Sequence, residues 1–448
     1  MITSKQNNPG AARFGLVLLS VAFLLAGVQP AAAVPQIMND YGDQMAWRSA
    51  EINSMGGTGV ALYRGGMSNI FNPAFLADEE SVRIDLGFSL DQEHEDRFVP
   101  LFNSFDSFVE DAAIASNRFH YWQSNFALAQ RLNTEGMPVT LGLSLTDRNP
   151  FQYNFYEEVR NPAFYPEGDR DVLIEEREFE VSGTLRNLSM GAGLELHERF
   201  SLGATVHYAF GKRKETTSVS DNWEEDGSYR IEEEMDLEGL NFTLGLKSTL
   251  NNRMEIGFAW ESQLLAEGDT SGEMHFANPD SVFTSVSIAL SDTYFRYPNI
   301  FRGGLTFRPR TDPKTVFTME LEYIPWDEMA DSRFPGYDNP RNLQDTKDVR
   351  IGLEHTFYNG SPMRFGFRHA NSYLDRDASC SFFTAGVGIP YSKGMFSASL
   401  ELGKVVSIQD HIFPYVPSEE LDEAYEADPQ ARVVDTRFRL GVGYSLSY

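Results

Sequence analysis

The 448-residue chain has a single cysteine, Cys380, so it holds no internal disulfide. In an exported protein a lone cysteine leaves a free thiol or an intermolecular bridge, and an unpaired thiol is the simpler expectation. Basic residues are also scarce: 37 Lys and Arg stand against 65 Asp and Glu, and the net charge is −28. Because phosphate backbones are bound by clustered Lys and Arg, the composition argues against a nucleic-acid partner.

Long apolar runs are missing beyond the N-terminus, and the mean hydropathy is −0.34. A membrane-spanning helix needs about 18 consecutive apolar residues, so no such helix is expected after residue 33. The first residues differ, because two basic residues precede an apolar stretch at 14–28, and three alanines follow at 31–33. This order predicts a secretory signal peptide over residues 1–33 that is cleaved near Val34.

Common catalytic and metal-binding motifs are missing too. The chain contains no His-Glu-x-x-His, Gly-x-Ser-x-Gly or Walker sequence, and its eight histidines include no close pair at metal-ligand spacing. A glycine cluster at 54–62 lacks the preceding strand and the third glycine of a dinucleotide loop. A Ser/His pair assembled across strands is the remaining catalytic alternative. The sequence thus predicts no enzyme, no cofactor and no metal site.

The pattern that is present is a two-residue alternation, and the C-terminus shows it most clearly. From Phe438 to Tyr448 the even-numbered residues are apolar or aromatic, while the odd-numbered ones are charged, small or polar. A period of two places the two sets on opposite faces of a β-strand. The strand is long enough to cross a bilayer when tilted, although a soluble sandwich strand shows the same pattern.

Fourteen segments after residue 82 have strand character. They lie near 83–91, 119–132, 138–147, 178–196, 200–214, 229–249, 253–263, 296–308, 316–326, 347–357, 362–373, 381–390, 395–406 and 434–447. Their connections alternate between long and short after the first strand, as in bacterial membrane barrels with short periplasmic turns and longer extracellular loops. We therefore predict an all-β fold: a transmembrane antiparallel β-barrel of about fourteen strands over residues 83–448, in the bacterial outer membrane. Within the first long loop, residues 105–115 suggest a short amphipathic helix.

The bilayer determines which face of each strand points inward. In a membrane barrel the apolar faces contact lipid and the polar faces line the lumen. The residues predicted to line the lumen are Arg350, Glu354, Arg364, Arg368, Glu401, Arg437 and Arg439. Since both signs of charge occur, we expect ion pairs that fill the lumen, with a selectivity filter as the alternative. Acidic loop segments at 157–158, 224–226 and 419–428 suggest solvated loop charge, with cation-bridged lipopolysaccharide as the alternative.

Two N-terminal motifs resemble a known family. Residues 55–61 form a glycine-rich segment, and Asn72-Pro73-Ala74 follows it. Together with segments 301–305 and 322–326, they resemble the FadL-type outer-membrane transport proteins. The resemblance implies that residues 34–82 form an N-terminal hatch that plugs the barrel, with Asn72, Pro73 and Ala74 as candidate hatch and ligand-gating residues.

The same resemblance implies a function. FadL-type proteins carry long-chain fatty acids and other hydrophobic compounds, so passive uptake of such molecules and an apolar pocket of a few hundred Å³ are expected. The expected partners are outer-membrane lipid and lipopolysaccharide, an apolar small-molecule ligand, and the barrel-assembly machinery, which would read the strand ending in Tyr448. Porin-V-like relatives handle protein cargo, so the alternative is a barrel subunit of a protein secretion or assembly complex. A general porin is a weaker third possibility.

Overall fold

The described part of the chain in this computed structural model comprises residues 40–42, 49–62, 64–102, 105, 107–132, 138–160, 173–221, 228–276, 284–334, 339, 342–413 and 430–448. The predicted signal peptide at 1–33 and the acidic segments at 224–226 and 419–428 lie outside these residues. Residues 37–409 together with 431–448 form one compact unit, which the following description concerns. None of the described helices combines the length and the apolar character that crossing a bilayer requires.

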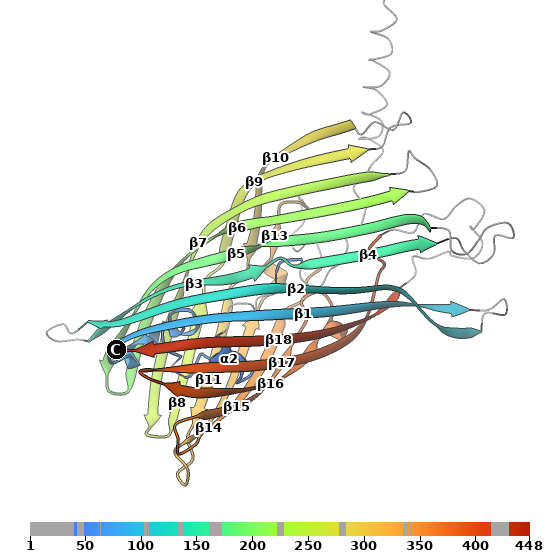
Figure 1. Cartoon of the computed structure of the whole chain (residues 1–448). Coiled ribbons are helices and arrows are strands. Elements are labelled where there is room, and N and C mark those ends of the chain that lie inside the picture. Colours follow the sequence, from blue (N-terminus) through green and yellow to red (C-terminus); the bar gives the residue numbers. More distant parts are fainter. Residues whose placement is uncertain are drawn as a thin grey trace, which may run out of the picture. The chain divides into compact units, whose positions relative to one another are not determined.

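The described residues form one sheet of eighteen hydrogen-bonded strands (Figure 1). These strands are β1 Val82–Phe102, β2 Phe108–Leu132, β3 Val139–Pro150, β4 Tyr153–Arg160, β5 Leu173–His197, β6 Phe200–Asp221, β7 Tyr229–Asn251, β8 Met254–Glu261, β9 Leu264–Phe276, β10 Thr284–Tyr297, β11 Ile300–Phe307, β12 Thr315–Ile324, β13 Ala330–Asp331, β14 Thr346–Thr356, β15 Pro362–Ala370, β16 Cys380–Tyr391, β17 Gly394–Gln409 and β18 Ala431–Ser447. Four consecutive pairs continue one another along a single barrel strand: β3 with β4, β8 with β9, β10 with β11, and β12 with β13. The predicted fourteen-stranded antiparallel barrel is thereby confirmed.

The last strand closes the barrel against the first. β18 pairs with β1 from Arg83↔Ser447 to Phe98↔Arg432. Beyond this ladder, the backbone N–H of Tyr448 donates to the carbonyl of Val82 at 2.9 Å. In lipid every backbone polar group needs an internal partner, and closure supplies one for the edge strands.

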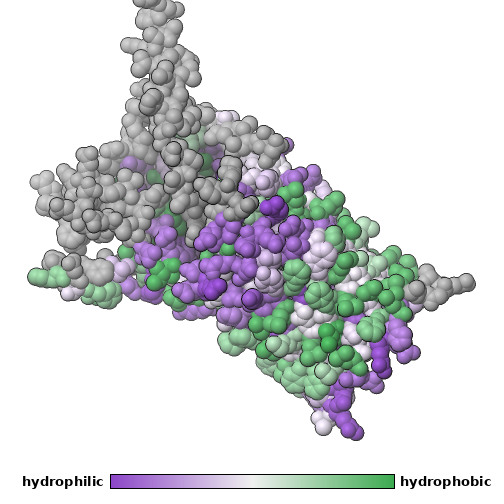
Figure 2. All heavy atoms as spheres, turned by 180° about the vertical axis from the view of Figure 1, so that it is seen from behind, coloured by the Kyte–Doolittle hydropathy of each residue, from purple (hydrophilic) through white to green (hydrophobic). Residues whose placement is uncertain are grey.

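The lower part of the barrel, toward the short turns, is apolar outside and polar inside. On β7, Leu240 and Phe242 are exposed, whereas Asn241 and Thr243 are buried in the lumen. Figure 2 shows apolar residues gathered over one stretch of the outer surface, bordered by hydrophilic residues. This is the arrangement that a lipid environment requires, and it agrees with the predicted orientation of the strand faces.

Farther along the strands, toward the long loops, the two faces exchange character. On β7 Asp236 and Glu238 are exposed, whereas Met235 and Leu237 are buried. Other strands repeat the change, with apolar side chains buried on the inner faces of β4, β5, β9 and β10: Tyr153, Phe155, Phe179, Val181, Leu264, Ala266, Phe295 and Tyr297. The strands thus leave the lipid near Leu240. Beyond that level water is outside, and the inner faces of these strands carry apolar side chains, among which lie buried charged groups such as Glu95, Arg97 and Arg213.

Residues 49–62 and 64–79, here called the inner segment, lie within the barrel. They contain the helices α2 Ala50–Asn53, α3 Ser68–Phe71 and the 3-10 helix η1 Pro73–Asp78. α2 packs against β16, β17 and β18, while η1 packs against β5, β6 and β7. Since these strands belong to different sides of the barrel and α2, α3 and η1 are almost entirely buried, the inner segment fills the lumen at this level.

Several predicted boundaries were wrong at the long-loop end. The helix predicted at 105–115 is wrong, because β2 begins at Phe108. Residues 264–295, which connect the predicted strands 253–263 and 296–308, contain β9 and most of β10. Glu157 and Glu158, predicted in a loop, lie on β4. Where the strands leave the lipid, the apolar residues move from the outer to the inner face. A strand predicted from one continuous apolar face therefore ends at this level, although the backbone ladder continues.

Candidate functional site in the barrel lumen

The backbone of the inner segment packs closely against glycines of the surrounding strands. A Cβ atom added at Gly257 would overlap the carbonyl oxygen of Val60, and one at Gly203 would overlap the backbone of Pro73. A Cβ atom at Gly352 would lie 2.8 Å from the carbonyl oxygen of Met55. Only a residue without a side chain lets two backbones approach this closely. The wall of the barrel is therefore shaped to the inner segment.

Asn72, which the motif placed at the hatch, fixes the start of η1. Its side-chain oxygen accepts from the N–H of Ala74 at 3.2 Å, which caps the helix whose first residue is Pro73. Its amide nitrogen donates to the carbonyls of Val60 at 2.8 Å and Leu246 at 3.0 Å. All three motif residues are buried, and the hydrogen bonds of Asn72 join two parts of the inner segment to β7.

Ten charged side chains from nine barrel strands form ion pairs on the inner wall of the barrel, mostly between neighbouring strands, while Arg148–Glu261 joins β3 to β8. This arginine–carboxylate belt consists of Asp91, Arg148, Glu261, Arg302, Glu320, Glu322, Arg350, Arg368, Glu401 and Arg439. Arg302 bonds Glu322 at 2.6 Å and Glu261 at 3.2 Å, and Arg368 bonds Glu401 at 3.1 Å. Because a buried charge is stable only when it is paired, these ion pairs hold the belt as a polar layer on the inner wall.

Glu320 connects the belt to the inner segment. One of its oxygens accepts from the N–H groups of Gly59 at 2.8 Å and Val60 at 3.0 Å. The other oxygen pairs with Arg350 at 2.5 Å, and Arg350 also pairs with Glu322. The arginine therefore holds the carboxylate that in turn holds the inner segment.

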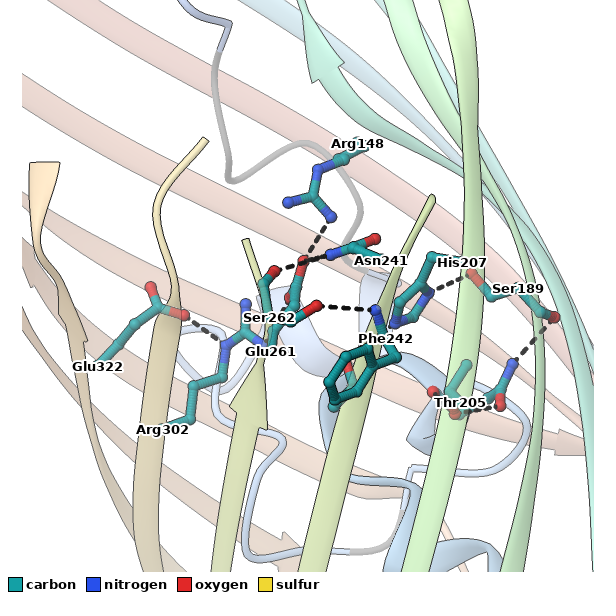
Figure 3. Close-up of polar contacts among 12 residues, drawn as sticks. Arg148, Ser189, Thr205, His207, Asn241, Phe242, Glu261, Ser262, Arg302 and Glu322 are labelled. Atoms are coloured by element: carbon teal, nitrogen blue, oxygen red, sulfur yellow. Dashed lines mark hydrogen bonds and ion pairs between the residues drawn. The ribbon is translucent and has the colours of Figure 1, made fainter. Parts of the chain in front are cut away.

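A second polar group lies beside the belt, on β5, β6 and β7 (Figure 3). His207 is buried, with its Nδ1 at 2.7 Å from the hydroxyl of Ser189 and its Nε2 at 2.8 Å from the hydroxyl of Thr243. Nearby, the amide of Asn241 donates to Glu261 at 3.1 Å. Within the described residues no carboxylate hydrogen-bonds to the His207 ring, so this Ser/His pair lacks the third group of a triad.

Above the belt, residues 40–42 lie in the apolar part of the lumen. The Tyr41 ring packs against Phe295, Trp326 and Tyr373 at centroid distances of 5.6, 6.3 and 6.1 Å. Asp40 pairs with Arg213 at 2.9 Å and with Arg333 at 3.4 Å. Burial alone would lower the pKa of Arg333, but Asp40 and Asp331 raise it well above its usual value, so the guanidinium stays charged.

A cavity of about 130 Å³ lies between this aromatic cluster and the belt. Tyr121, Trp326, Tyr373 and Phe382 form its apolar side. Its polar side includes Asp91, Glu93, Glu322, Asp348, Arg368, Glu401, Arg437 and Arg439. The pocket expected from the sequence was apolar and larger, and the belt accounts for the difference because its charged side chains occupy the inward positions at this level.

Each residue predicted to line the lumen takes part in an ion pair. Arg350, Arg368, Glu401 and Arg439 belong to the belt. Arg364 pairs with Glu354 at 2.6 Å and lies 3.6 Å from Glu51 of the inner segment, while Arg437 pairs with Glu93 at 2.9 Å. The sequence reasoning missed Asp91, Arg148, Glu261, Arg302, Glu320 and Glu322 as lumen residues. Their signal was available, since each occupies an alternate position within or beside an apolar strand.

Metal binding finds no support in the described residues, which include no group of three or more His, Cys, Asp and Glu side chains placed to hold an ion. Cys380 is a buried free cysteine near the cavity.

The fold is shared with solved outer-membrane channels. A FadL homologue from Pseudomonas aeruginosa matches with a TM-score of 0.64 at 12% identity, over 91% of this chain and 99% of that one. The toluene transporter TodX from P. putida gives 0.63 at 13% identity, over 91% and 99%. The toluene transporter TbuX from Ralstonia pickettii gives 0.54 at 14% identity, over 90% and 99%. No curated protein matches the chain.

At these identities the likeness establishes the fold, and the predicted resemblance to FadL-type proteins is confirmed at that level. The closed barrel with an apolar outer band also confirms the predicted place in the bacterial outer membrane. The family is shown by a separate comparison, in which the family model described as BamG matches residues 13–406. The chain is therefore a member of the BamG family, built on the FadL-type outer-membrane barrel.

Proposed function

We propose that this protein is an outer-membrane channel that admits small hydrophobic compounds from the extracellular side and releases them sideways through the barrel wall. The observation that carries the proposal is the exchange of the strand faces beyond Leu240. Outside the lipid, an inward apolar face has no membrane to contact, and we propose that it lines a chamber for the cargo. The aromatic side chains around Tyr41 and Tyr153 belong to this lining.

A route straight down the lumen is disfavoured. Below the chamber an apolar molecule meets the buried ion pairs of the belt. Below them lies the inner segment, which packs against glycines of the barrel wall. Moving the cargo past them would break charge pairs whose loss leaves buried charges unpaired. We assign a hatch function to the inner segment, with Asn72, Pro73 and Ala74 holding it closed.

We assign the exit of the cargo to the break between β3 and β4. The strand is interrupted at residues 151–152, and the pairing register with β5 shifts between Asp147 and Asn149. Next to the break, the side chain of Asn149 donates to the carbonyl of Tyr41 at 3.2 Å. The N-terminal residues therefore contact both the aromatic cluster and the interrupted wall.

The size of the cavity favours a compact cargo. In size alone, its volume of about 130 Å³ is close to that of an apolar cavity that holds benzene, about 150 Å³, and is too small for an extended acyl chain. A ring would pack on its aromatic side, formed by Tyr121, Trp326, Tyr373 and Phe382. A ring-sized hydrophobic compound is therefore the proposed cargo, and a long-chain fatty acid is the alternative within the same function. TodX and TbuX, which share the fold, are toluene transporters, and this agrees with the choice.

Uptake measurements in cells that lack other hydrophobic-compound channels test the proposal. The wild-type protein is expected to accelerate toluene uptake severalfold and oleate uptake much less. Tyr41→Ala removes a ring from the chamber and is expected to raise oleate uptake relative to toluene uptake. Tyr156→Ala is the matched control, because Tyr156 is exposed on the outer face of β4. If the protein changes the uptake of neither toluene nor oleate, the channel function is excluded.

A barrel subunit of a protein secretion or assembly complex is the second candidate. The observation in its favour is the closed lumen, because a barrel that serves as a docking partner has no need of an open path. Purification from native outer membrane in mild detergent, followed by mass spectrometry, separates the two. A stoichiometric protein partner with no bound apolar molecule would favour the second candidate.

A further inference from the structure

The barrel wall has a second defect, located on the side formed by β8 to β13. β8 ends at Glu261 and β9 begins at Leu264, β10 ends at Tyr297 and β11 begins at Ile300, and β12 ends at Ile324 before β13 begins at Ala330. Pairing places these gaps side by side, as Glu261 lies opposite Ile300, Leu264 opposite Tyr297, and Arg296 opposite Ala330. Three neighbouring strands therefore interrupt their ladders at one level.

Two of the gaps contain proline, which has no N–H to donate to a ladder. Pro298 lies in the β10–β11 gap, and Pro325 precedes the 3-10 helix η3 Trp326–Glu328 in the β12–β13 gap. Side chains replace some of the lost backbone bonds, since the indole N–H of Trp260 donates to Asn299 at 3.1 Å and Gln263 donates to Glu328 at 3.3 Å. The wall is consequently indented here, without a continuous ladder.

The indentation is a pocket of about 870 Å³ that includes outward-facing side chains. It lies at the upper edge of the lipid band, because Leu240, the last outward apolar residue of β7, is one of its walls. Phe242 and Trp260 continue the apolar wall toward the membrane, whereas Ser262, Gln263 and Asn299 supply polar groups. The lining is thus apolar on its membrane side and polar on its solvent side, as at the surface of the outer leaflet.

The pocket also holds one exposed cation. Arg296 points outward from β10, and within the described residues it forms no ion pair with another side chain. Asp327 and Glu328 lie on the neighbouring η3, so the anion that fits must approach from the β10 side of the pocket. A guanidinium at the level of lipid headgroups is suited to bind a phosphate with two parallel hydrogen bonds.

We infer that this pocket, the β8–β13 groove, binds the phosphorylated sugar headgroup of lipopolysaccharide from the outer leaflet. Arg296 takes a phosphate, the amides of Gln263 and Asn299 face sugar hydroxyls, and one acyl chain lies along Leu240, Phe242 and Trp260. The headgroup, with its hydroxyl and phosphate oxygens, would lie where the ladder is incomplete and could pair with backbone groups that hydrocarbon cannot satisfy. The size of the groove is within the usual range of ligand sites, about 300–1,000 Å³.

Native mass spectrometry of the full-length barrel in detergent tests the site, with deep-rough lipopolysaccharide as the probe and phosphatidylglycerol as the competing anionic lipid. One lipopolysaccharide molecule is expected to bind in preference to phosphatidylglycerol. Arg296→Gln is expected to weaken that binding about tenfold or more, the range for a lost hydrogen bond to a charged group.

Arg118→Gln is the matched control, because Arg118 is exposed on β2 beyond the outward-facing Trp122, lies outside the groove and, within the described residues, forms no ion pair. It is expected to leave the affinity unchanged within about twofold. Equal affinity of the wild-type protein and Arg296→Gln for lipopolysaccharide would overturn the assignment. Equally tight binding of phosphatidylglycerol would overturn the choice of a glycolipid, and no bound lipopolysaccharide at all would remove the site.

Discussion

Replacing Arg350 by alanine is expected to lower the free energy of unfolding of the barrel by about 3–5 kcal/mol, the usual result of removing one partner from a buried ion pair. Arg350 is 1% exposed and pairs with both Glu320 and Glu322. Without it, two carboxylates remain buried next to each other without their shared cation. Glu320 also holds the amides of Gly59 and Val60, so the inner segment is expected to loosen as well.

The measurement is the urea concentration at which half of the purified protein is unfolded. The folded fraction is read from the mobility of the folded barrel in gel electrophoresis of unheated samples. Arg160→Ala is the control, because Arg160 and Glu158 form an exposed pair on β4, with side-chain exposures of 48% and 38%. Exposed pairs contribute about 0–1 kcal/mol, so the control is expected to unfold close to the wild-type midpoint. Similar midpoints for the two variants would contradict the structural role of the belt.

Replacing Gly257 by alanine is expected to displace the inner segment and to open an ion path through the barrel. The new Cβ atom would overlap the carbonyl oxygen of Val60. β8 is held by ladders to β7 and β11, so the inner segment is the part that must move. Overpacking of this kind costs about 1–3 kcal/mol, and here the strain falls on the closure of the lumen.

Single-channel conductance in planar bilayers measures this opening. Gly257→Ala is expected to show frequent conducting steps, whereas the wild-type protein stays mostly closed. The neighbouring β11 supplies a matched control, since a Cβ atom at Gly303 would have no atom within 4 Å. Gly303→Ala is therefore expected to stay closed. Equal conductance in the two variants would show that the contacts at the wall glycines do not hold the inner segment in place.

Much of the fold could be predicted from the sequence because membrane barrels impose strict alternation. Arg350 and Arg368 stood at inward positions between outward apolar residues, and the structure places both in ion pairs. The partners were harder to identify: Glu320 and Arg350 are 30 residues apart, and their pairing depends on the register of β12 with β14. Alternation indicates which face a residue occupies, but not which residue lies opposite.

Two other features were beyond sequence reasoning for physical reasons. The inward apolar side chains begin where the strand faces exchange character. In the sequence this change resembles the end of a strand, as at Met235 and Leu237. The gaps around Pro298 and Pro325 are visible as prolines, but their alignment at one level follows only from the pairing of β9 with β10 and of β10 with β13. Both features depend on the level of the membrane surface, which no local pattern encodes.

A disulfide that locks the inner segment to the wall tests the central claim most directly. A Cβ atom at Gly443 on β18 would lie 3.7 Å from the Cβ of Ala50, within the disulfide range of about 3.5–4.5 Å. The variant Ala50→Cys/Gly443→Cys, in a Cys380→Ser background, can be compared with itself in oxidised and reduced form. If cargo leaves sideways above a closed hatch, toluene uptake will be the same in both forms. Uptake that stops on oxidation and returns on reduction would show that the cargo passes through the hatch, and would contradict the sideways route.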